Sequence, residues 1–336
     1  MLNVTVFIPL PPEELSLLWF WIPLALGIFG LLMWPLSYLI ASFCVYNATL
    51  RRRTPDKWAR KRQFDDPLSV KMDGEGMAWH EANLAYKKDV HIVNDGLNLY
   101  GEYYDFGHGR CVFILSGRTE SLRYGYYFAK PYADAGWNVL VLDPRAHGFS
   151  DGEFNTVGFE ESRDWLAWAR YMHDVQGVRE ILFHGICIGA AGGTFALVDE
   201  DCPDYIVGIV ADGMFANFGE SMKNHLIERK KPIFMLYGMI DMWMKLYTGH
   251  SMNYGPIDVI HKQTRPMLML YGCEDLYSVP HYAQKLFDRI GTDKKQLVWF
   301  EHGAHSMLRV TDPERYDNAI HAFLSQYFAK DEAPLR

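Results

Sequence analysis

A cysteine flanked by glycines, at the end of an apolar run, constrains the fold of this chain more than any other feature. Residues 180–183 have the composition of a buried strand and lead through His184 into Gly-Ile-Cys-Ile-Gly at 185–189. Small, helix-compatible residues follow as far as Ala196. Glycines on both sides let the backbone turn sharply from strand to helix, so that the side chain of Cys187 projects above the sheet. The first N–H groups of the helix then point toward any negative charge that develops beside it.

Other apolar runs of strand length are spread along the chain, and each ends in polar residues. They cover 110–115, 137–143, 206–211, 267–272 and 296–300. Between the first two runs, residues 124–135 have the apolar spacing of a helix. Short buried strands that alternate with helices predict a parallel sheet with helices on its faces. Ligand chemistry in such sheets gathers at the carboxyl ends of the strands.

Three residues with complementary chemistry each follow one of these runs. Cys187 follows 180–183, Asp275 follows 267–272, and His305 follows 296–300. An imidazole can take a thiol proton and later activate water, while a carboxylate orients the ring. A thiolate that attacks a carbonyl carbon forms a thioester, which water then hydrolyses. The three positions therefore predict a Cys–His–Asp triad.

Four motifs, in this order along the chain, resemble the α/β-hydrolase superfamily. They are Ser-Gly-Arg-Thr-Glu-Ser at 116–121, Asp-Pro-Arg-Ala-His-Gly-Phe-Ser at 143–150, the cysteine motif, and Gly-Cys-Glu-Asp-Leu-Tyr-Ser-Val-Pro at 272–280. The likeness covers about residues 90–328 and is greatest to the branch of monoacylglycerol lipases, lysophospholipases and serine aminopeptidases. The order nucleophile, acid, base also fits this layout. A cysteine at the position of the usual serine is similar to dienelactone hydrolases.

The resemblance implies a role for each site residue. Cys187 corresponds to the nucleophile, Asp275 to the acid and His305 to the general base. The backbone N–H groups of Arg118 and Ile188 correspond to the oxyanion hole. No side chain identifies that hole, so it is carried over by position alone.

The triad positions have alternatives close by in the sequence. His302 lies three residues before His305, and Glu274 adjoins Asp275. Asp212, after the run at 206–211, is a further alternative, because some relatives place the acid there. His305 is preferred because the family has Gly-Ala-His-Ser after this strand, with a small residue that brings the ring over the nucleophile. Asp275 is preferred because a proline follows it within a few residues, as in the family.

The segment from Phe215 to about Lys262 is too long for an ordinary connection between strands. In the family, an insertion here forms a helical cap over the active site. Seven methionines lie inside the segment or just before it, and Met235, Met239 and Met242 share one helical face. Methionine adapts to flexible apolar ligands. These residues therefore either line a pocket for an acyl chain or pack the cap onto the body.

Residues 15–50 contain no charged side chain and are followed directly by Arg51-Arg52-Arg53. A hydrocarbon core of about 30 Å needs roughly 20 apolar residues, so the segment predicts one transmembrane helix. A signal peptide has a basic start and a short apolar core, whereas this segment has an acidic start and a long core, which indicates an uncleaved anchor. Lysine and arginine are absent before residue 51 and frequent just after it. The positive-inside rule then predicts a cytoplasmic catalytic domain.

These boundaries divide the 336 residues into four parts. They are an anchor at 1–50, a basic juxtamembrane connector at 51–86, a hydrolase domain at 87–330 with the cap at about 215–262, and a tail at 331–336. The net charge of −8, with basic residues concentrated near the anchor, argues against nucleic-acid binding. The five scattered cysteines imply no disulfide framework. Neither zinc-type spacing nor a phosphate-binding glycine loop occurs, so we expect no metal or other cofactor.

Taken together, the sequence predicts a single-pass membrane protein that hydrolyses carboxylic esters, with small lipid or acyl esters favoured, through a thioester acyl-enzyme. Cleavage of an amide, lactone or thioester is one alternative, which the thiol and the aminopeptidase-like relatives permit. A catalytically idle membrane scaffold, with Cys187 as an inert core thiol, is another. The side chains of Arg118 and Glu120 either line the pocket or form a solvated pair. The oligomeric state is left open.

Overall fold

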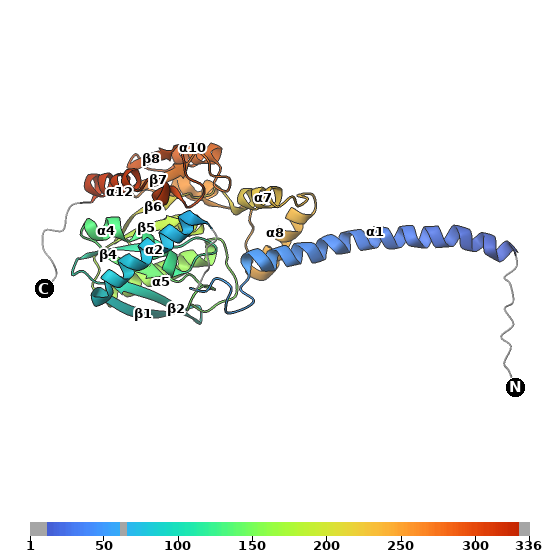
Figure 1. Ribbon diagram of the computed structural model, residues 1–336, viewed down its shortest axis with the longest axis horizontal. Helices are drawn as coiled ribbons and strands as arrows, with labels where there is room; N and C mark the ends of the chain where they lie inside the picture. Colours follow the sequence, from blue (N-terminus) through green and yellow to red (C-terminus); the bar gives the residue numbers. More distant parts are fainter. Residues whose placement is uncertain (1–11, 61–65, 329–336) are drawn as a thin grey trace, which may run out of the picture.

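The computed structural model of this chain describes residues 12–60 and 66–328 (Figure 1). The first residues of the predicted anchor and the predicted tail at 331–336 lie outside this part. A long N-terminal helix leaves a rounded body, in which one sheet is surrounded by helices. The order and direction of the strands in that sheet determine where the candidate site residues meet.

The body is built on an eight-stranded sheet with the order β1-β2-β4-β3-β5-β6-β7-β8. The strands are β1 (Lys87–Asn94), β2 (Leu97–Tyr104), β3 (Arg110–Leu115), β4 (Asn138–Leu142), β5 (Glu180–Ile186), β6 (Ile206–Asp212), β7 (Met267–Gly272) and β8 (Lys295–Phe300). β2 pairs antiparallel with β1 and β4, and the other neighbours pair in parallel. All six predicted strands are therefore present, in a mostly parallel sheet as expected. The β1–β2 hairpin was not predicted.

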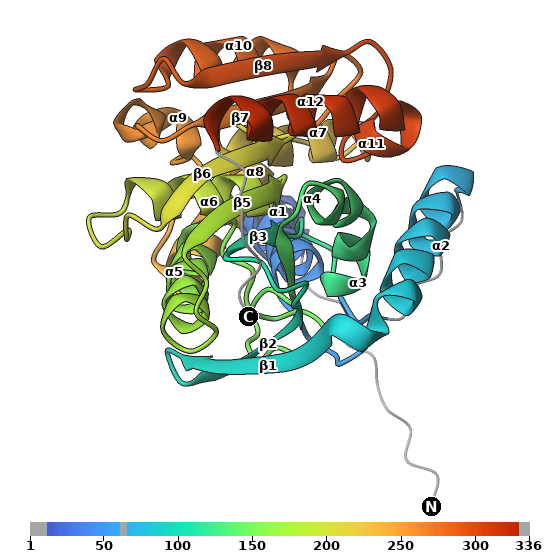
Figure 2. The same ribbon diagram turned by 90° about the vertical axis from the view of Figure 1, so that its left-hand side faces the viewer.

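Helices cover both faces of the sheet, as Figure 2 shows. One face carries α5 (Phe159–Asp174), α6 (Ile188–Val198) and α10 (Pro280–Arg289), and the other carries α3 (Leu122–Gly125), α4 (Lys130–Asp134) and α12 (Pro313–Tyr327). The side chains of β3 explain this arrangement, because Val112 and Ile114 pack into one hydrophobic cluster while Phe113 and Leu115 pack into another. A strand buried on both faces needs apolar side chains at successive positions. Shorter elements are η1 (Leu84–Tyr86), η2 (Tyr126–Phe128), α9 (Pro256–Val259), η3 (Ile260–Lys262) and α11 (Leu308–Thr311).

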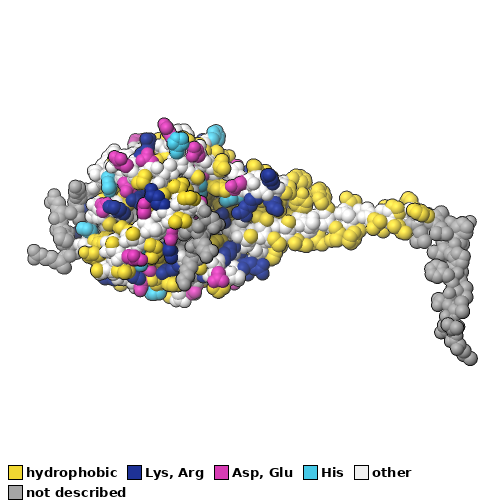
Figure 3. Space-filling view, in the orientation of Figure 1, with side chains coloured by type: hydrophobic (Ala, Val, Ile, Leu, Met, Phe, Trp, Pro, Cys, Tyr) yellow, Lys and Arg dark blue, Asp and Glu magenta, His cyan; other side chains and the backbone are white. Residues whose placement is uncertain are grey.

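The helix α1 (Pro12–Leu50) has two different environments along its length. Its outer part projects from the body and shows mostly hydrophobic side chains (Figure 3), and Trp19 and Leu31 are more than two-thirds exposed, at 79 % and 73 %. By length and composition the stretch Trp19–Leu50 can cross a membrane, with a mean hydropathy of 1.9. Its last turns are instead docked on the body, where Tyr46 and Leu50 are fully buried.

The docked end of α1 packs against the segment between β6 and β7. That segment contains α7 (Phe218–Glu228) and α8 (Leu236–Thr248), and α8 lies beside the base of α1 in Figure 1. Trp243 donates its indole N–H to the hydroxyl of Ser42 over 2.9 Å, and Tyr247 stacks on Tyr46 with ring centroids 5.5 Å apart. The cap of this protein is therefore joined directly to the helix that precedes the domain.

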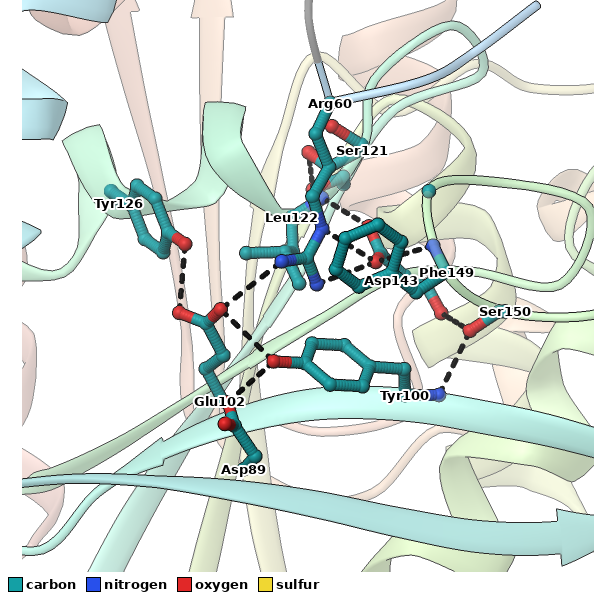
Figure 4. Close-up of polar contacts among 12 residues, drawn as sticks. Arg60, Asp89, Tyr100, Glu102, Ser121, Leu122, Tyr126, Asp143, Phe149 and Ser150 are labelled. Carbon is teal, nitrogen blue, oxygen red and sulfur yellow. Dashed lines mark hydrogen bonds and ion pairs between the residues drawn. The ribbon is translucent and has the colours of Figure 1, made fainter. Parts of the chain in front are cut away.

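The described residues of the predicted connector at 51–86 pack on the body. They include α2 (Pro67–Ala82), and two of the basic residues that precede it, Arg52 and Arg60, have specific partners. Arg60 forms ion pairs with Asp143 at 2.9 Å and with Glu102 at 3.2 Å, and its guanidinium lies 3.8 Å from the ring centroid of Phe149 (Figure 4). Arg52 donates to the carbonyl oxygens of residues 148 and 150. These contacts hold the turn that follows β4.

Candidate active site

Cys187 lies at the bend between β5 and α6, with φ +54° and ψ −108°. A residue with a Cβ rarely adopts a positive φ, and such strain concentrates at functional sites. The two neighbouring glycines have no room for a side chain. A Cβ on Gly185 would lie 2.4 Å from the backbone of Ala190, and a Cβ on Gly189 would lie 1.9 Å from the carbonyl oxygen of Leu115. The sharp bend inferred from the sequence is therefore present, and both glycines are required for it.

The structure brings Cys187, His305 and Asp275 together. The ring of His305 places Nδ1 2.7 Å from Oδ2 of Asp275, and His305 lines the same cavity as Cys187. The other oxygen of Asp275, Oδ1, accepts the backbone N–H groups of Tyr277 and Ser278, each over 2.8 Å. These bonds orient the carboxylate toward the imidazole, in the relation that a nucleophile–base–acid triad requires.

The electrostatic surroundings favour a protonated His305. Burial of the ring opposes protonation, but negative charge on Cys187 and on Asp275 raises the pKa of His305 well above its ordinary value. An imidazolium at this position stabilises a thiolate next to it, which is the nucleophilic form of cysteine. The site is therefore suited to thiolate chemistry.

The alternative residues occupy other places. His302 and Glu274 pair with each other at the surface, 3.2 Å apart, and both side chains are more than half exposed. Asp212 is fully buried behind the site, where Oδ2 accepts the hydroxyl of Tyr316 over 2.7 Å. Its backbone carbonyl accepts the N–H of Cys187 over 2.9 Å. Asp212 thus supports the bend through its main chain, while Asp275 holds the ring of His305.

The loop after β3 supplies the second wall of the bend. A Cβ on Gly117 would lie 3.7 Å from the Cβ of Cys187, so the loop runs close against the cysteine. The ring nitrogen Nε2 of His147 lies 2.7 Å from the carbonyl oxygen of Arg118. Within the described residues, the N–H groups of Arg118 and Ile188 have no hydrogen-bond acceptor. Free N–H groups at this place are available to a developing oxyanion.

A cavity of about 280 Å³ opens above Cys187 and His305. Its walls come from α2, the loop after β3, α3, α7, the loop after β7 and the loop that carries His305. The residues are Ser69, Met72, Asp73, Gly117, Arg118, Thr119, Glu120, Tyr124, Phe218, Ser221, His225, Tyr277, Ser306 and Met307. A space of this size suits a small ligand. The contribution of α2 was not predicted, because nothing in the sequence connects this helix with a motif about a hundred residues further on.

None of the methionines of the cap is among the residues that line this cavity, which favours the second interpretation, that they pack the cap onto the body. Met244 and Met252 are fully buried in the main hydrophobic cluster. Met242 faces outward and is 42 % exposed. The methionines at the cavity are Met72 and Met307, from outside the cap.

The side chains of Arg118 and Glu120 both line the cavity, rather than forming a pair in solvent. Arg118 Nη1 donates to the carbonyl oxygen of Thr49 over 3.1 Å, at the last turn of α1. Burial lowers the pKa of Arg118, and the positive Arg229 adds to this effect. Burial and then Arg118 lower the pKa of His225 to about 3, so that ring is neutral at physiological pH. The described residues contain no group of three side chains that could hold a metal ion.

Comparison with known proteins agrees with this architecture. No protein-family model matches the chain. Over 220 residues, 65 % of this chain and 69 % of the relative, it is 28 % identical to the uncharacterized protein YqkD of Bacillus subtilis (strain 168). The esterase Pf2001 of Pyrococcus furiosus is similar in structure, with a TM-score of 0.62 and 22 % identity, covering 81 % of this chain and 99 % of that one.

Two further solved structures are similar to this chain in fold. An α/β-hydrolase from Vibrio vulnificus has a TM-score of 0.56 and 16 % identity, covering 82 % of this chain and all (100 %) of that one. The α/β-hydrolase GrgF from Penicillium sp. sh18 has a TM-score of 0.57 and 16 % identity, covering 72 % and 98 %. The protein therefore has the α/β-hydrolase fold, as its motifs predicted. At these identities the likeness defines the fold alone.

Proposed function

We propose that this protein is a membrane-anchored hydrolase of carboxylic esters, with small lipid or acyl esters as its substrates. The observation that carries this proposal is the hydrogen-bonded pair His305–Asp275, which lies with Cys187 at one cavity. Solved structures of similar fold include an esterase and two other hydrolases, which supports hydrolysis as the class of reaction. The resemblance to the monoacylglycerol-lipase branch stays a prediction.

The proposed reaction has two halves. The proton of Cys187 lies on His305 before the attack, and the thiolate sulfur attacks the ester carbonyl carbon. The oxyanion that forms is held by the N–H groups of Arg118 and Ile188. When the intermediate collapses, the C–O bond to the alcohol breaks, and His305 gives its proton to the departing oxygen. A water molecule, deprotonated by His305, then attacks the thioester, releases the acid and restores the thiol. Asp275 keeps the ring in place and stabilises its charged form.

The test uses the full chain in detergent and nitrophenyl esters of short and long acids. Cys187→Ala is expected to lower kcat/KM by at least about 10³-fold, because it removes the attacking atom. Cys273→Ser changes an exposed thiol outside the site and serves as the matched control. Ester hydrolysis that persists in Cys187→Ala would overturn the assigned role. Amide, lactone and thioester substrates run in parallel, and cleavage of one of these without esters would redefine the bond.

A chemical probe separates an active thiol from an idle scaffold. Iodoacetamide is expected to label Cys187 rapidly at neutral pH and to abolish hydrolysis, whereas a fluorophosphonate directed at serine nucleophiles should label little. Slow labelling together with no hydrolysis of any substrate would support the scaffold instead.

We also propose that α1 anchors the protein as a single uncleaved span, with the catalytic domain in the cytoplasm. The support is its exposed apolar outer part and the basic residues at its end. The exposed Cys273 reports the side on which the domain lies. A membrane-impermeant maleimide should label Cys273 only after cells are lysed, and Cys273→Ser gives the background. Labelling in intact cells would reverse the orientation, and a mature chain shortened by the length of the helix would indicate a signal sequence.

A further inference from the structure

The end of α7, the connection to α8 and the first residue of α8, together residues 227–236, carry exposed apolar and exposed basic side chains. We call this segment the cap tip. Ile227 and Phe234 are apolar and 58 % and 70 % exposed, and Ile233 is 37 % exposed. Between them lie Arg229, Lys230 and Lys231, also exposed, and no described carboxylate forms an ion pair with any of these three. Exposed apolar side chains on either side of basic ones that form no ion pair are typical of a surface that meets a lipid headgroup layer.

The cap tip lies against the outer part of α1. A groove between them is lined on the helix side by Ser37, Tyr38, Ala41, Cys44 and Val45, and on the tip side by Lys231, Pro232 and Leu236. The helix residues in this groove belong to the stretch where α1 changes from exposed to buried. The cap tip therefore lies beside the turns of α1 at which the exposed apolar stretch of the helix ends.

That level coincides with the expected bilayer surface. At about 1.5 Å per residue, the exposed stretch at 17–40 is about 35 Å long, which matches a hydrocarbon core of about 30 Å. If one end of this stretch is at the far surface, the other end brings Ser37 to Ala41 to the near surface. The cap tip, which touches these turns, is then at the depth of the headgroups.

The cap tip carries three basic residues and one acidic residue, Glu228, which accepts the hydroxyl of Tyr277. Figure 3 shows dark blue side chains gathered around the base of α1, next to hydrophobic ones on the adjoining surface of the body. Arg51 and Arg52 are engaged with the body, through Glu153 and backbone carbonyls. Arg53 and the three basic residues of the cap tip are exposed. Anionic lipids supply the complementary charge, and each lysine or arginine near such a surface strengthens binding by about fivefold.

We propose that the cap tip binds the anionic headgroup layer of the membrane, with Ile233 and Phe234 at the boundary of the acyl chains and Arg229, Lys230 and Lys231 among the phosphates. The inference rests on the proposed anchor, but it does not depend on the role of Cys187. α7 runs from this tip to the cavity, where Phe218, Ser221 and His225 form one wall. A cap tip held in the headgroup layer thus fixes that wall next to the lipid surface, from which a lipid ester would enter.

Two basic residues of the cap tip, Arg229 and Lys230, are trypsin sites, whereas Lys231 precedes Pro232 and is not cleaved; these two sites provide a direct test on the full chain. In nanodiscs of phosphatidylcholine with a third phosphatidylglycerol, cleavage after Arg229 and Lys230 should be on the order of tenfold slower than in phosphatidylcholine alone. High salt should remove part of this protection. Cleavage after Lys285, an exposed residue on α10, is the internal control and should be equal in both lipids.

A paired variant tests the apolar half. Ile233→Asp with Phe234→Asp should remove most of the protection while leaving hydrolysis of a water-soluble ester unchanged, and Val175→Asp, at an exposed apolar residue outside the cap, should do neither. Equal cleavage in the two lipids would overturn the proposal. Protection that follows protein concentration rather than lipid charge would assign the cap tip to a second copy of the chain and also overturn it. A chain that does not enter nanodiscs refutes the anchor and this inference together, whereas loss of hydrolysis in Cys187→Ala concerns the proposed function alone.

Discussion

The backbone of Cys187 has a positive φ, and its N–H donates a hydrogen bond to the carbonyl oxygen of Asp212. Together these two features fix the direction of the cysteine side chain. Strain of this kind costs roughly 1–3 kcal/mol and persists only where the surroundings impose it. Here the surroundings are backbone atoms that pack directly against Gly185 and Gly189 and leave no space for a Cβ at either position. The reactive atom is therefore held by packing of main chain against main chain, which no rearrangement of side chains can relax.

Gly189→Ala should prevent stable folding or lower the free energy of unfolding by more than about 3 kcal/mol, because overpacking and forced backbone shifts are expensive. The added carbon would lie 1.9 Å from the carbonyl oxygen of Leu115. Gly74→Ala in α2, where nothing lies within 4 Å, is the control and should stabilise by about 0.5–1 kcal/mol. Thermal unfolding of the two variants measures the difference. Equal melting temperatures would contradict the crowding at the bend.

Asp212 makes stability depend on pH. Burial raises the pKa of Asp212 to about 7, from an ordinary value of 3.8. Between these values the folded state binds more protons than the unfolded state, so stability falls as pH rises from about 4 to 7 and the loss is complete above that. The shift corresponds to roughly 4 kcal/mol at most. Asp212→Asn, which stays neutral and can still accept from Tyr316, should gain stability over the natural protein at pH 8 but not at pH 4.

Denaturant unfolding at the two pH values measures this gain. Asp174→Asn, a change on the helix α5 outside the site, controls for surface charge. A difference between Asp212→Asn and the natural protein that stays constant from pH 4 to pH 8 would show that this carboxyl does not titrate in the range.

Among the elements, α1 could be predicted only in part. A helix that is apolar all round is either buried in protein or surrounded by lipid, and residues 15–50 give no local sign of where one environment ends. The structure places the change between Ile40, which is 57 % exposed, and Ser42, which is fully buried. The reason is tertiary: Trp243 and Tyr247 of α8, some two hundred residues away, receive the last turns of the helix.

Tyr46 tests how this docking works. Its ring is fully buried against Tyr247, and its hydroxyl has no hydrogen-bond partner among the described residues. Tyr46→Phe should leave stability unchanged or raise it by about 1 kcal/mol, because it removes an unsatisfied polar group. Tyr46→Ala should lower it by about 3–5 kcal/mol through the cavity it leaves. Equal losses in both variants, by denaturant unfolding, would mean that the hydroxyl has a partner after all.

The sheet and the bend were predictable because their signals are local. Six strands show continuous apolar runs, and the two glycines around Cys187 mark the turn. The β1–β2 hairpin also has a local signal, the pair Asp95-Gly96, which is typical of a tight hairpin turn. In the structure both residues have the positive φ that such a turn requires, at 50° and 75°. The cavity walls were predictable only in part. Phe218 lies in the segment expected to cap the site, whereas nothing in the sequence connects Met72 on α2 with Cys187.

For the whole molecule, the point at which α1 becomes buried against the body, between Ile40 and Ser42, does not coincide with the end of the apolar segment at Leu50. A chain that begins at Arg51 would lack Tyr46 and Leu50, which belong to the main hydrophobic cluster. A chain that begins at Ser42 keeps them. We expect the longer chain to be monodisperse and to melt several degrees higher, because large buried side chains each contribute about 2–5 kcal/mol. Size-exclusion chromatography and thermal unfolding compare the two. Indistinguishable melting would show that the docked turns are dispensable.

The bond from Arg118 to the carbonyl oxygen of Thr49 gives the domain a mechanical link to its tether. Helices longer than the local bilayer thickness tilt to hide their apolar surface. A tilt of α1 would pull on the same short loop whose N–H groups face Cys187. With α1 in a membrane, as proposed, catalytic rate would then vary with the chain length of the surrounding lipids, and the protein would respond to the thickness of the bilayer.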